Sequence, residues 1–224
     1  MKAKDLARYI DHTLLRADAA AKDIERLCAE AREHHFYAVC VNGSWVVQAR
    51  HLLDGSAVKV ATVVGFPLGA TDSDTKRFET EAAIDNGAQE IDAVINLGRL
   101  KDGNYDYVLR ELRDVAEAAD ERPVKVILET GLLTHEEKIR ACRLVLDSGA
   151  QFVKTSTGFS SSGATIEDVE LLRGIVGEKL GVKAAGGIRD APTALAMIEA
   201  GATRLGTSAG VAIVRGPAGK AHSY

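Results

Sequence analysis

Short apolar runs recur along this chain and alternate with longer, helix-like stretches. Eight of the runs have the length and the β-branched content of strands, and they cover residues 9–13, 37–41, 58–64, 90–95, 124–129, 151–155, 181–185 and 203–206. Between them lie amphipathic stretches that include residues 75–86, 106–119, 134–148 and 166–176. Regular alternation of strand and helix, without a break in composition, predicts parallel strand pairing in one domain.

Capping signals mark several of the predicted helices. Gly87, Gly149 and Gly201 each follow a helical stretch directly before the next strand, which is where glycine ends helices. Thr134 has Glu137 three residues further on, the spacing of a capping box at a helix N-terminus. These signals support the same division into strands and helices.

Eight strand–helix units in 224 residues fit a closed (β/α)8 TIM barrel with a short N-terminal helix. We expect one domain over residues 1–224, with a mobile tail at residues 216–224. An open, doubly wound sheet is the main rival. It would more often carry a G-x-G-x-x-G fingerprint after its first strand, and this chain has none there.

Composition excludes several classes of function. The net charge of −4 argues against nucleic-acid binding, which usually requires a basic face. The longest stretch without Asp, Glu, Lys or Arg, residues 34–49, is too short to cross a membrane. No apolar signal segment follows Met1, and the three cysteines have no CxxC spacing, so we expect a cytoplasmic protein with reduced thiols. The six histidines show no metal-ligand spacing, and we expect no metal site.

Two lysines and an aspartate occupy strand positions that face the barrel interior. In residues 90–95 the apolar positions alternate with Asp92, which therefore points inward if the apolar set meets the helices. The same parity places Lys154 and Lys183 inside the barrel. Taken singly, Asp92 could be structural, and each lysine could extend its ammonium to solvent. Together they indicate a site in which a neighbouring charge keeps one amine neutral.

Electrostatics supports that interpretation. Adjacent strands lie about 4.8 Å apart. Two ammoniums about 5 Å apart repel by roughly 3 kcal/mol at an effective dielectric constant near 20, which corresponds to about two pKa units. Such a shift, with some desolvation, produces the neutral amine that attacks carbonyl compounds.

Glycines cluster after the last predicted strands, where barrels of this kind bind phosphate through backbone N–H groups. Gly186 and Gly187 follow the seventh strand, and Gly206 and Ser208 lie at the eighth. Gly158, after the sixth strand, adds another amide. Singly, each glycine could serve only a tight turn, but their clustering favours a phosphate site.

Five further residues have both a structural and a functional interpretation. Asp11 and Thr13 end the first strand and either line the site or form a structural hydrogen-bond cluster. Cys40 ends the second strand and is either a pocket residue or a small buried thiol. Lys59 and Lys125 lie toward the N-terminal ends of their strands, so we assign them structural roles.

The chain resembles the deoxyribose-phosphate aldolases over nearly its whole length. The resemblance rests on residues 11–15 (DHTLL), 64–69 (VGFPLG), 90–96 (EIDAVIN), 152–159 (FVKTSTGF) and 182–189 (VKAAGGIR). It implies that Lys154 forms a Schiff base and that Asp92 and Lys183 donate and accept protons. It also implies a catalytic Tyr224 at the chain end and a phosphate site made by Gly158, Gly186, Gly187, Gly206 and Ser208. Some relatives have a second serine where this chain has Ala209, so only a backbone contact is available there.

The reaction implied by the resemblance is reversible cleavage of 2-deoxy-D-ribose 5-phosphate to acetaldehyde and D-glyceraldehyde 3-phosphate. It requires no cofactor, because the lysine imine acts as the electron sink. The expected partners are these small molecules and further copies of the chain in a dimer or tetramer. Two alternatives stay open: a Schiff-base barrel enzyme of the transaldolase type, and a non-catalytic barrel that binds a sugar phosphate.

Overall fold

The computed structural model describes residues 3–216. Most of the predicted tail, including Tyr224, lies outside these residues. The described chain forms a closed barrel of eight parallel strands in the order β1 to β8, with β1 and β8 paired to complete it. The predicted (β/α)8 fold is therefore confirmed, and the open sheet is excluded.

The strands are short and follow the predicted runs closely. Their bounds are β1 Ile10–Leu14, β2 Ala38–Val41, β3 Lys59–Val64, β4 Glu90–Val94, β5 Val124–Ile127, β6 Phe152–Lys154, β7 Gly181–Ala185 and β8 Arg204–Thr207. The α-helices are α1 Ala21–His34, α2 Val46–Leu52, α3 Ser73–Asp85, α4 Leu97–Lys101, α5 Tyr105–Ala118, α6 His135–Leu146, α7 Ile166–Val176, α8 Ala191–Glu199 and α9 Gly210–Arg215. Three 3-10 helices complete the described elements: η1 Ala3–Tyr9, η2 Gly43–Trp45 and η3 Thr130–Leu132.

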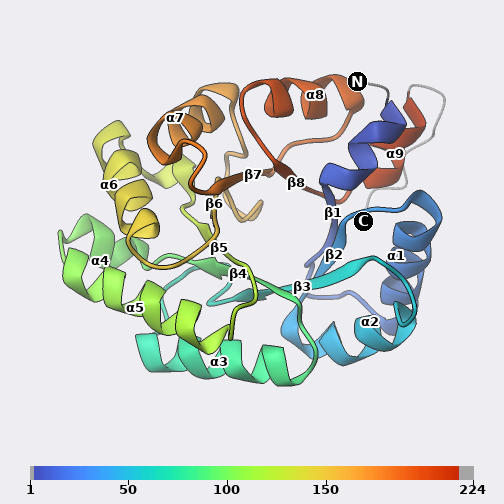
Figure 1. Ribbon diagram of the computed structural model, residues 1–224, viewed down its shortest axis with the longest axis horizontal. Helices are drawn as coiled ribbons and strands as arrows, with labels where there is room; N and C mark the ends of the chain where they lie inside the picture. Colours follow the sequence, from blue (N-terminus) through green and yellow to red (C-terminus); the bar gives the residue numbers. More distant parts are fainter. Residues whose placement is uncertain (1–2, 217–224) are drawn as a thin grey trace.

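The helices form an outer ring around the strands (Figure 1). The predicted N-terminal helix is a 3-10 helix, η1, which packs beside α9 and α8. Residues 166–176 form α7 with the predicted bounds, and the capping box of Thr134 and Glu137 opens α6. Gly87, Gly149 and Gly201 have positive φ angles of 99°, 91° and 113°, as expected for glycines that end helices.

The two faces of each strand meet different surroundings. Outward-facing residues such as Val39, Ile91, Val153 and Val182 join one large apolar cluster with the helices. Cys40 on β2, Ala61 and Val63 on β3, and Leu15 just after β1 form a small, separate apolar cluster, with Phe66 packed against it. The rest of the interior, from β4 through β8 to β1, is lined by charged side chains. The barrel therefore has one apolar and one ionic half.

A buried lysine outside the barrel fixes one of the loops at its mouth. Lys76 Nζ on α3 donates to the carbonyl oxygens of Gly69 and Val94, both at 2.8 Å, and pairs with Glu111 at 2.7 Å. These bonds tie the connection between β3 and α3 to β4 and α5. Phe66 in that connection packs edge-on against Phe159, with ring centroids 5.2 Å apart.

Candidate active site

Lys154 lies at the C-terminal end of β6, beside Ile127 on β5 and Lys183 on β7. Val153 faces the helices, so strand alternation turns the Lys154 side chain into the barrel, where it is 3% exposed. Active sites of (β/α)8 barrels form at this end of the strands. The predicted inward orientation of Lys154 is confirmed.

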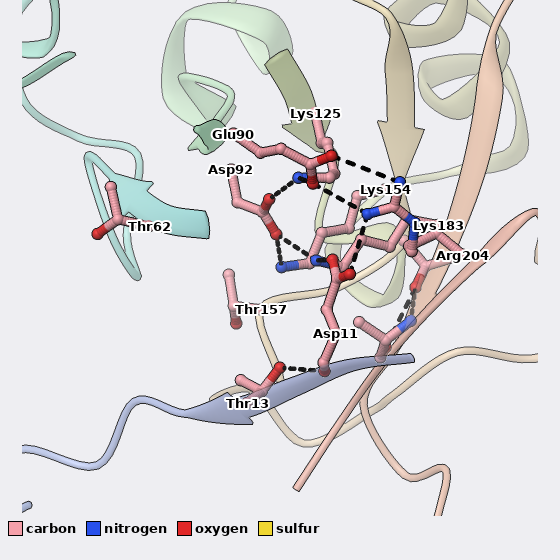
Figure 2. Close-up of polar contacts among 12 residues, drawn as sticks. Asp11, Thr13, Thr62, Glu90, Asp92, Lys125, Lys154, Thr157, Lys183 and Arg204 are labelled. Atoms are coloured by element: carbon pink, nitrogen blue, oxygen red, sulfur yellow. Dashed lines mark hydrogen bonds and ion pairs between the residues drawn. The ribbon is translucent and has the colours of Figure 1, made fainter. Parts of the chain in front are cut away.

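Asp92, in the middle of β4, accepts hydrogen bonds from three ammonium groups (Figure 2). Its Oδ2 lies 2.7 Å from Lys154 Nζ and 2.8 Å from Lys183 Nζ. Its Oδ1 lies 2.8 Å from Lys125 Nζ. The three residues that sequence parity predicted to converge, Asp92, Lys154 and Lys183, are thus in direct contact.

The ionic contacts extend further than the sequence indicated. Lys183 also donates to Asp11, and Arg204 Nη1 lies 2.9 Å from both Asp11 and Glu90. Lys125 Nζ bridges Asp92 and Glu90, at 2.8 and 2.7 Å. Lys125 is therefore more than the structural residue that the sequence predicted, because it binds Asp92, the carboxylate that also binds Lys154.

Sequence reasoning missed Glu90 and Arg204 as members of this ionic group. The signal for Glu90 was available, since it shares strand parity with the inward-facing Asp92. Arg204 offered no comparable signal, because its partners lie 193 and 114 residues away in the chain. Its guanidinium also stacks 3.5 Å from the centroid of the Tyr37 ring.

Among the described residues, this ionic group contains three carboxylates and four cationic side chains: Asp11, Glu90, Asp92, Lys125, Lys154, Lys183 and Arg204. If all of them were charged, one positive charge would be left uncompensated in the barrel interior. A buried excess charge is costly, and the group can remove it by releasing one proton.

Lys154 is the member that releases its proton most easily. Burial lowers its pKa, the carboxylate of Asp92 opposes that effect, and the ammonium of Lys183 lowers the pKa further, so the net change is downward. Burial also disfavours the charged form of Lys183, but Asp11 and Asp92 outweigh burial and raise its pKa. The predicted direction for Lys154 holds, although burial rather than Lys183 is the larger cause.

Asp92 and Lys125 stay ionised. Burial opposes ionisation of Asp92, but Lys125, Lys154 and Lys183 together hold its pKa well below the usual value. Burial likewise opposes the charge on Lys125, and Asp92 and Glu90 are among the neighbours that nevertheless raise its pKa. Asp92 therefore presents a permanent carboxylate to the Lys154 amine.

A cavity of about 290 Å³ opens above Lys154. Its lining includes all five residues predicted to bind phosphate, namely Gly158, Gly186, Gly187, Gly206 and Ser208. Thr13 and Thr157 also line it, as do two cations that sequence reasoning missed, Arg16 and Arg189. Arg189 is exposed at the mouth. The cavity thus joins an amine at its base to amides and a guanidinium at its opening.

Two predicted site-lining residues do not line this cavity. Asp11 is fully buried and contacts Lys183 and Arg204, so it acts on the site through those neighbours. Cys40 is fully buried in the apolar half of the barrel. Burial, with a contribution from Asp92, raises the pKa of its thiol to about 11, so the thiol is neutral at pH 7.

The described residues contain no cluster of three or more His, Cys, Asp or Glu side chains that could hold a metal ion. Within residues 3–216, every helix is too short or too polar to cross a membrane.

Comparisons with known proteins agree with this geometry. A family model described as DeoC/LacD family aldolase matches residues 6–216. A deoxyribose-phosphate aldolase from Bdellovibrio bacteriovorus is 57% identical over 211 residues, which cover 94% of this chain and 96% of the relative. A crystal structure of a putative deoxyribose-phosphate aldolase from Coccidioides immitis superposes with a TM-score of 0.94 at 43% identity, covering 96% of this chain and 86% of that one. A structure described as the unique tetrameric structure of deoxyribose phosphate aldolase from Aeropyrum pernix has a TM-score of 0.89 at 32% identity, covering 96% of this chain and 91% of that one.

Proposed function

The chain belongs to the DeoC/LacD family of aldolases, and we propose that it reversibly cleaves 2-deoxy-D-ribose 5-phosphate to acetaldehyde and D-glyceraldehyde 3-phosphate. The observation that carries this proposal is the contact between Lys154 and Asp92 at the base of a cavity whose opening is lined with glycines. A lysine with a lowered pKa is a nucleophile for aldehydes at neutral pH.

In the direction of synthesis, the neutral Lys154 amine attacks the carbonyl carbon of acetaldehyde and forms a carbinolamine. Loss of water gives a protonated imine, which draws electrons from the adjacent methyl carbon. A proton leaves that carbon, and the resulting enamine attacks the aldehyde carbon of D-glyceraldehyde 3-phosphate. A new carbon–carbon bond forms, and hydrolysis of the imine releases the sugar phosphate and restores Lys154.

Asp92 and Lys183 have separate roles in this scheme. The carboxylate of Asp92 orients the Lys154 amine and, through a water molecule, moves protons to and from the oxygen atoms of the intermediates. The ammonium of Lys183 disfavours a second positive charge at Lys154 and donates a hydrogen bond to the same carboxylate oxygen. Asp92 therefore contacts Lys154 directly, whereas Lys183 contacts the Asp92 oxygen that holds it.

The 5-phosphate is assigned to the opposite end of the cavity. Gly186 and Gly187 have positive φ angles of 91° and 80°, a conformation that lets backbone N–H groups turn toward an anion. Gly158, Gly206 and Ser208 complete the backbone and hydroxyl contacts, and Arg189 supplies a positive charge. Ala209 can contribute only through its backbone amide.

Borohydride trapping tests the proposal directly. Incubation with acetaldehyde and borohydride should add one reduced two-carbon group, which peptide mass spectrometry should locate on Lys154. Lys154→Met, which keeps a side chain of similar length, should not be labelled. An adduct mainly on Lys183, or none on the unaltered protein, would overturn the assignment. Failure to accept acetaldehyde as donor, with activity on a ketose phosphate, would favour a transaldolase-type enzyme.

We also propose a cytoplasmic location and a homo-oligomeric state for this chain. The three cysteines are free thiols, which fits a reducing cytoplasm. A relative from Aeropyrum pernix is described as tetrameric, which supports a homo-oligomer for this chain also. Light scattering coupled to size-exclusion chromatography distinguishes a monomer of 23.8 kDa from a dimer or tetramer.

A further inference from the structure

Glu129 is a buried acidic residue that the mechanism above does not use. It is 3% exposed and follows β5, at the end of the barrel that carries the cavity. Its backbone is left-handed, with φ 53° and ψ 62°, which is uncommon for a residue other than glycine. The N–H groups of Leu128 and Thr130 bond to the successive carbonyls of Lys154 and Thr155, so Glu129 is the extra residue in the ladder.

The carboxyl group of Glu129 holds Thr157, which lines the cavity. Its Oε2 accepts a hydrogen bond from the Thr157 hydroxyl and another, at 3.3 Å, from the Thr157 backbone N–H. The other oxygen, Oε1, is buried without a hydrogen-bond partner among the described residues. A buried carboxyl group is costly unless all its oxygens are hydrogen-bonded, and within residues 3–216 only one oxygen of Glu129 is bonded. A residue that keeps such a cost is a candidate for a functional role.

These contacts determine what the Thr157 hydroxyl can offer a substrate. A threonine hydroxyl donates one hydrogen bond and accepts two. The proton of Thr157 is directed to Glu129, and one lone pair accepts the Phe159 N–H at 3.1 Å. One lone pair remains, so Thr157 can act toward the cavity only as an acceptor.

The position of Thr157 suits the middle of the acceptor aldehyde. Along the chain it lies between Lys154, where the carbonyl carbon reacts, and Gly158, at the end assigned to phosphate, and all three residues line the cavity. In D-glyceraldehyde 3-phosphate the carbon next to the carbonyl carries a hydroxyl group, and the following carbon carries the phosphate. This hydroxyl group can donate to the remaining lone pair of Thr157.

From these contacts we infer that Glu129 is a positioning residue that fixes the Thr157 hydroxyl as an acceptor and so selects aldehyde acceptors with a hydroxyl beside the carbonyl. The inference rests on the proposed aldolase function and deepens it, since it concerns the choice of acceptor. Glu129 itself does not line the cavity and acts only through Thr157.

The experiment compares D-glyceraldehyde 3-phosphate with 3-oxopropyl phosphate, which lacks that hydroxyl, with acetaldehyde as donor. The unaltered enzyme should prefer the hydroxylated acceptor in kcat/KM by about tenfold, the effect of one hydrogen bond. Glu129→Leu and Thr157→Val should each reduce the preference to about threefold or less, with kcat/KM for 3-oxopropyl phosphate nearly unchanged. In the double variant, the preference for the hydroxylated acceptor should be no smaller than in either single variant, because both changes remove the same hydrogen bond. Glu129→Gln retains an oxygen that accepts the Thr157 proton and should keep the preference.

Three results would overturn the inference. One is a Glu129→Leu or Thr157→Val enzyme that keeps the preference. Another is a Glu129→Leu enzyme that loses activity equally with both acceptors, which would indicate a purely structural role. The third is loss of the preference in Thr13→Val but not in Thr157→Val, since Thr13 also lines the cavity. If Glu129→Leu does not fold, Thr157→Val still tests the acceptor contact on which the inference depends, and a preference that it leaves unchanged overturns the inference.

Acetaldehyde trapping at Lys154 separates this inference from the proposed function. Each variant should still be trapped, because donor activation does not involve Glu129. If the unaltered protein is not trapped, the proposed function fails and the inference fails with it. If trapping is normal and the preference is insensitive to the variants, only the inference fails.

Discussion

Lys154 and Lys183 donate hydrogen bonds to the same oxygen atom of Asp92, at 2.7 and 2.8 Å. The two ammoniums differ in what else they contact, since Lys183 also bonds to Asp11 and Lys154 has no second carboxylate among its described ion pairs. When the group loses a proton, the less stabilised ammonium loses it. Asp92 thus holds the two lysines together, and Lys154 is the one whose pKa is lowered.

Lys183→Leu should raise the pKa of Lys154, because the nearby ammonium that disfavours its charge is gone. Each unit by which the pKa of Lys154 rises lowers the fraction of neutral amine at pH 7 about tenfold. We expect kcat/KM at pH 7 to fall about tenfold or more, with partial recovery as the pH rises toward the new pKa. The dependence of kcat/KM on pH measures this.

Lys179→Leu serves as the control for that variant, since Lys179 is an exposed lysine before β7. Its pH profile should match that of the unaltered enzyme. A Lys183→Leu enzyme with an unchanged profile would show that Lys183 does not set the pKa of Lys154.

Lys154→Met should abolish activity and stabilise the fold at neutral pH. The folded-state pKa of Lys154 lies below its unfolded value, so the buried ammonium destabilises the native state at low pH. That penalty disappears as the pH rises through the folded pKa toward 10.5. We expect Tm at pH 7 to rise by about 2–4 °C, which corresponds to about 1 kcal/mol, and the gain to vanish near pH 10.5. A lower Tm for the variant by calorimetry at pH 7 would contradict this view.

Lys125→Met should destabilise the protein severely. It removes the ammonium between Asp92 and Glu90, and breaking a buried ion pair costs about 3–5 kcal/mol. Lys59→Met provides a matched comparison, because Lys59 lies on β3 but is exposed, and its effect should stay within about 0.5 kcal/mol. Urea denaturation measures both, and similar losses would mean that Lys125 contributes little to the ionic group.

Arg189→Gln should weaken use of the phosphorylated substrate. A charge-assisted hydrogen bond contributes about 1.5–3 kcal/mol, so kcat/KM for 2-deoxyribose 5-phosphate should fall at least about tenfold. With unphosphorylated 2-deoxyribose, which should be a much poorer substrate, the variant should match the unaltered enzyme. Arg16→Gln should have a smaller effect, since Asp18 and Asp23 already engage that guanidinium. Equal losses with both sugars would argue against a phosphate contact.

Deletion of Tyr224 tests a residue that lies outside the described part of the chain. The family resemblance assigns its phenol to proton transfer at the enamine carbon. Deletion should leave Schiff-base trapping intact and slow both cleavage and deuterium uptake into the acetaldehyde methyl group by about a hundredfold. Equal uptake rates for the intact and truncated proteins would remove Tyr224 from the mechanism.

Local sequence patterns were enough to predict the barrel and the inward orientation of Asp92, Lys154 and Lys183. Strand parity is a property of a few consecutive residues, so each side chain could be assigned to a face without knowledge of its neighbours. The glycines at 186 and 187 were likewise placed at the correct end, since βα connections in a barrel all emerge on one side.

Only the closed tertiary structure decided which charges touch. Pairing of β8 with β1 brings Asp11 to Lys183 and Arg204, across 172 and 193 residues, and no local pattern encodes such a contact. The same closure buried Lys154 in a group of three carboxylates and four cations, and burial is the larger cause of its lowered pKa. The left-handed backbone at Glu129 could not be predicted from the sequence either, because a glutamate carries no sequence signal for that conformation. Periodicity specifies the face of a strand, whereas the partners on that face depend on how all eight strands close around one another.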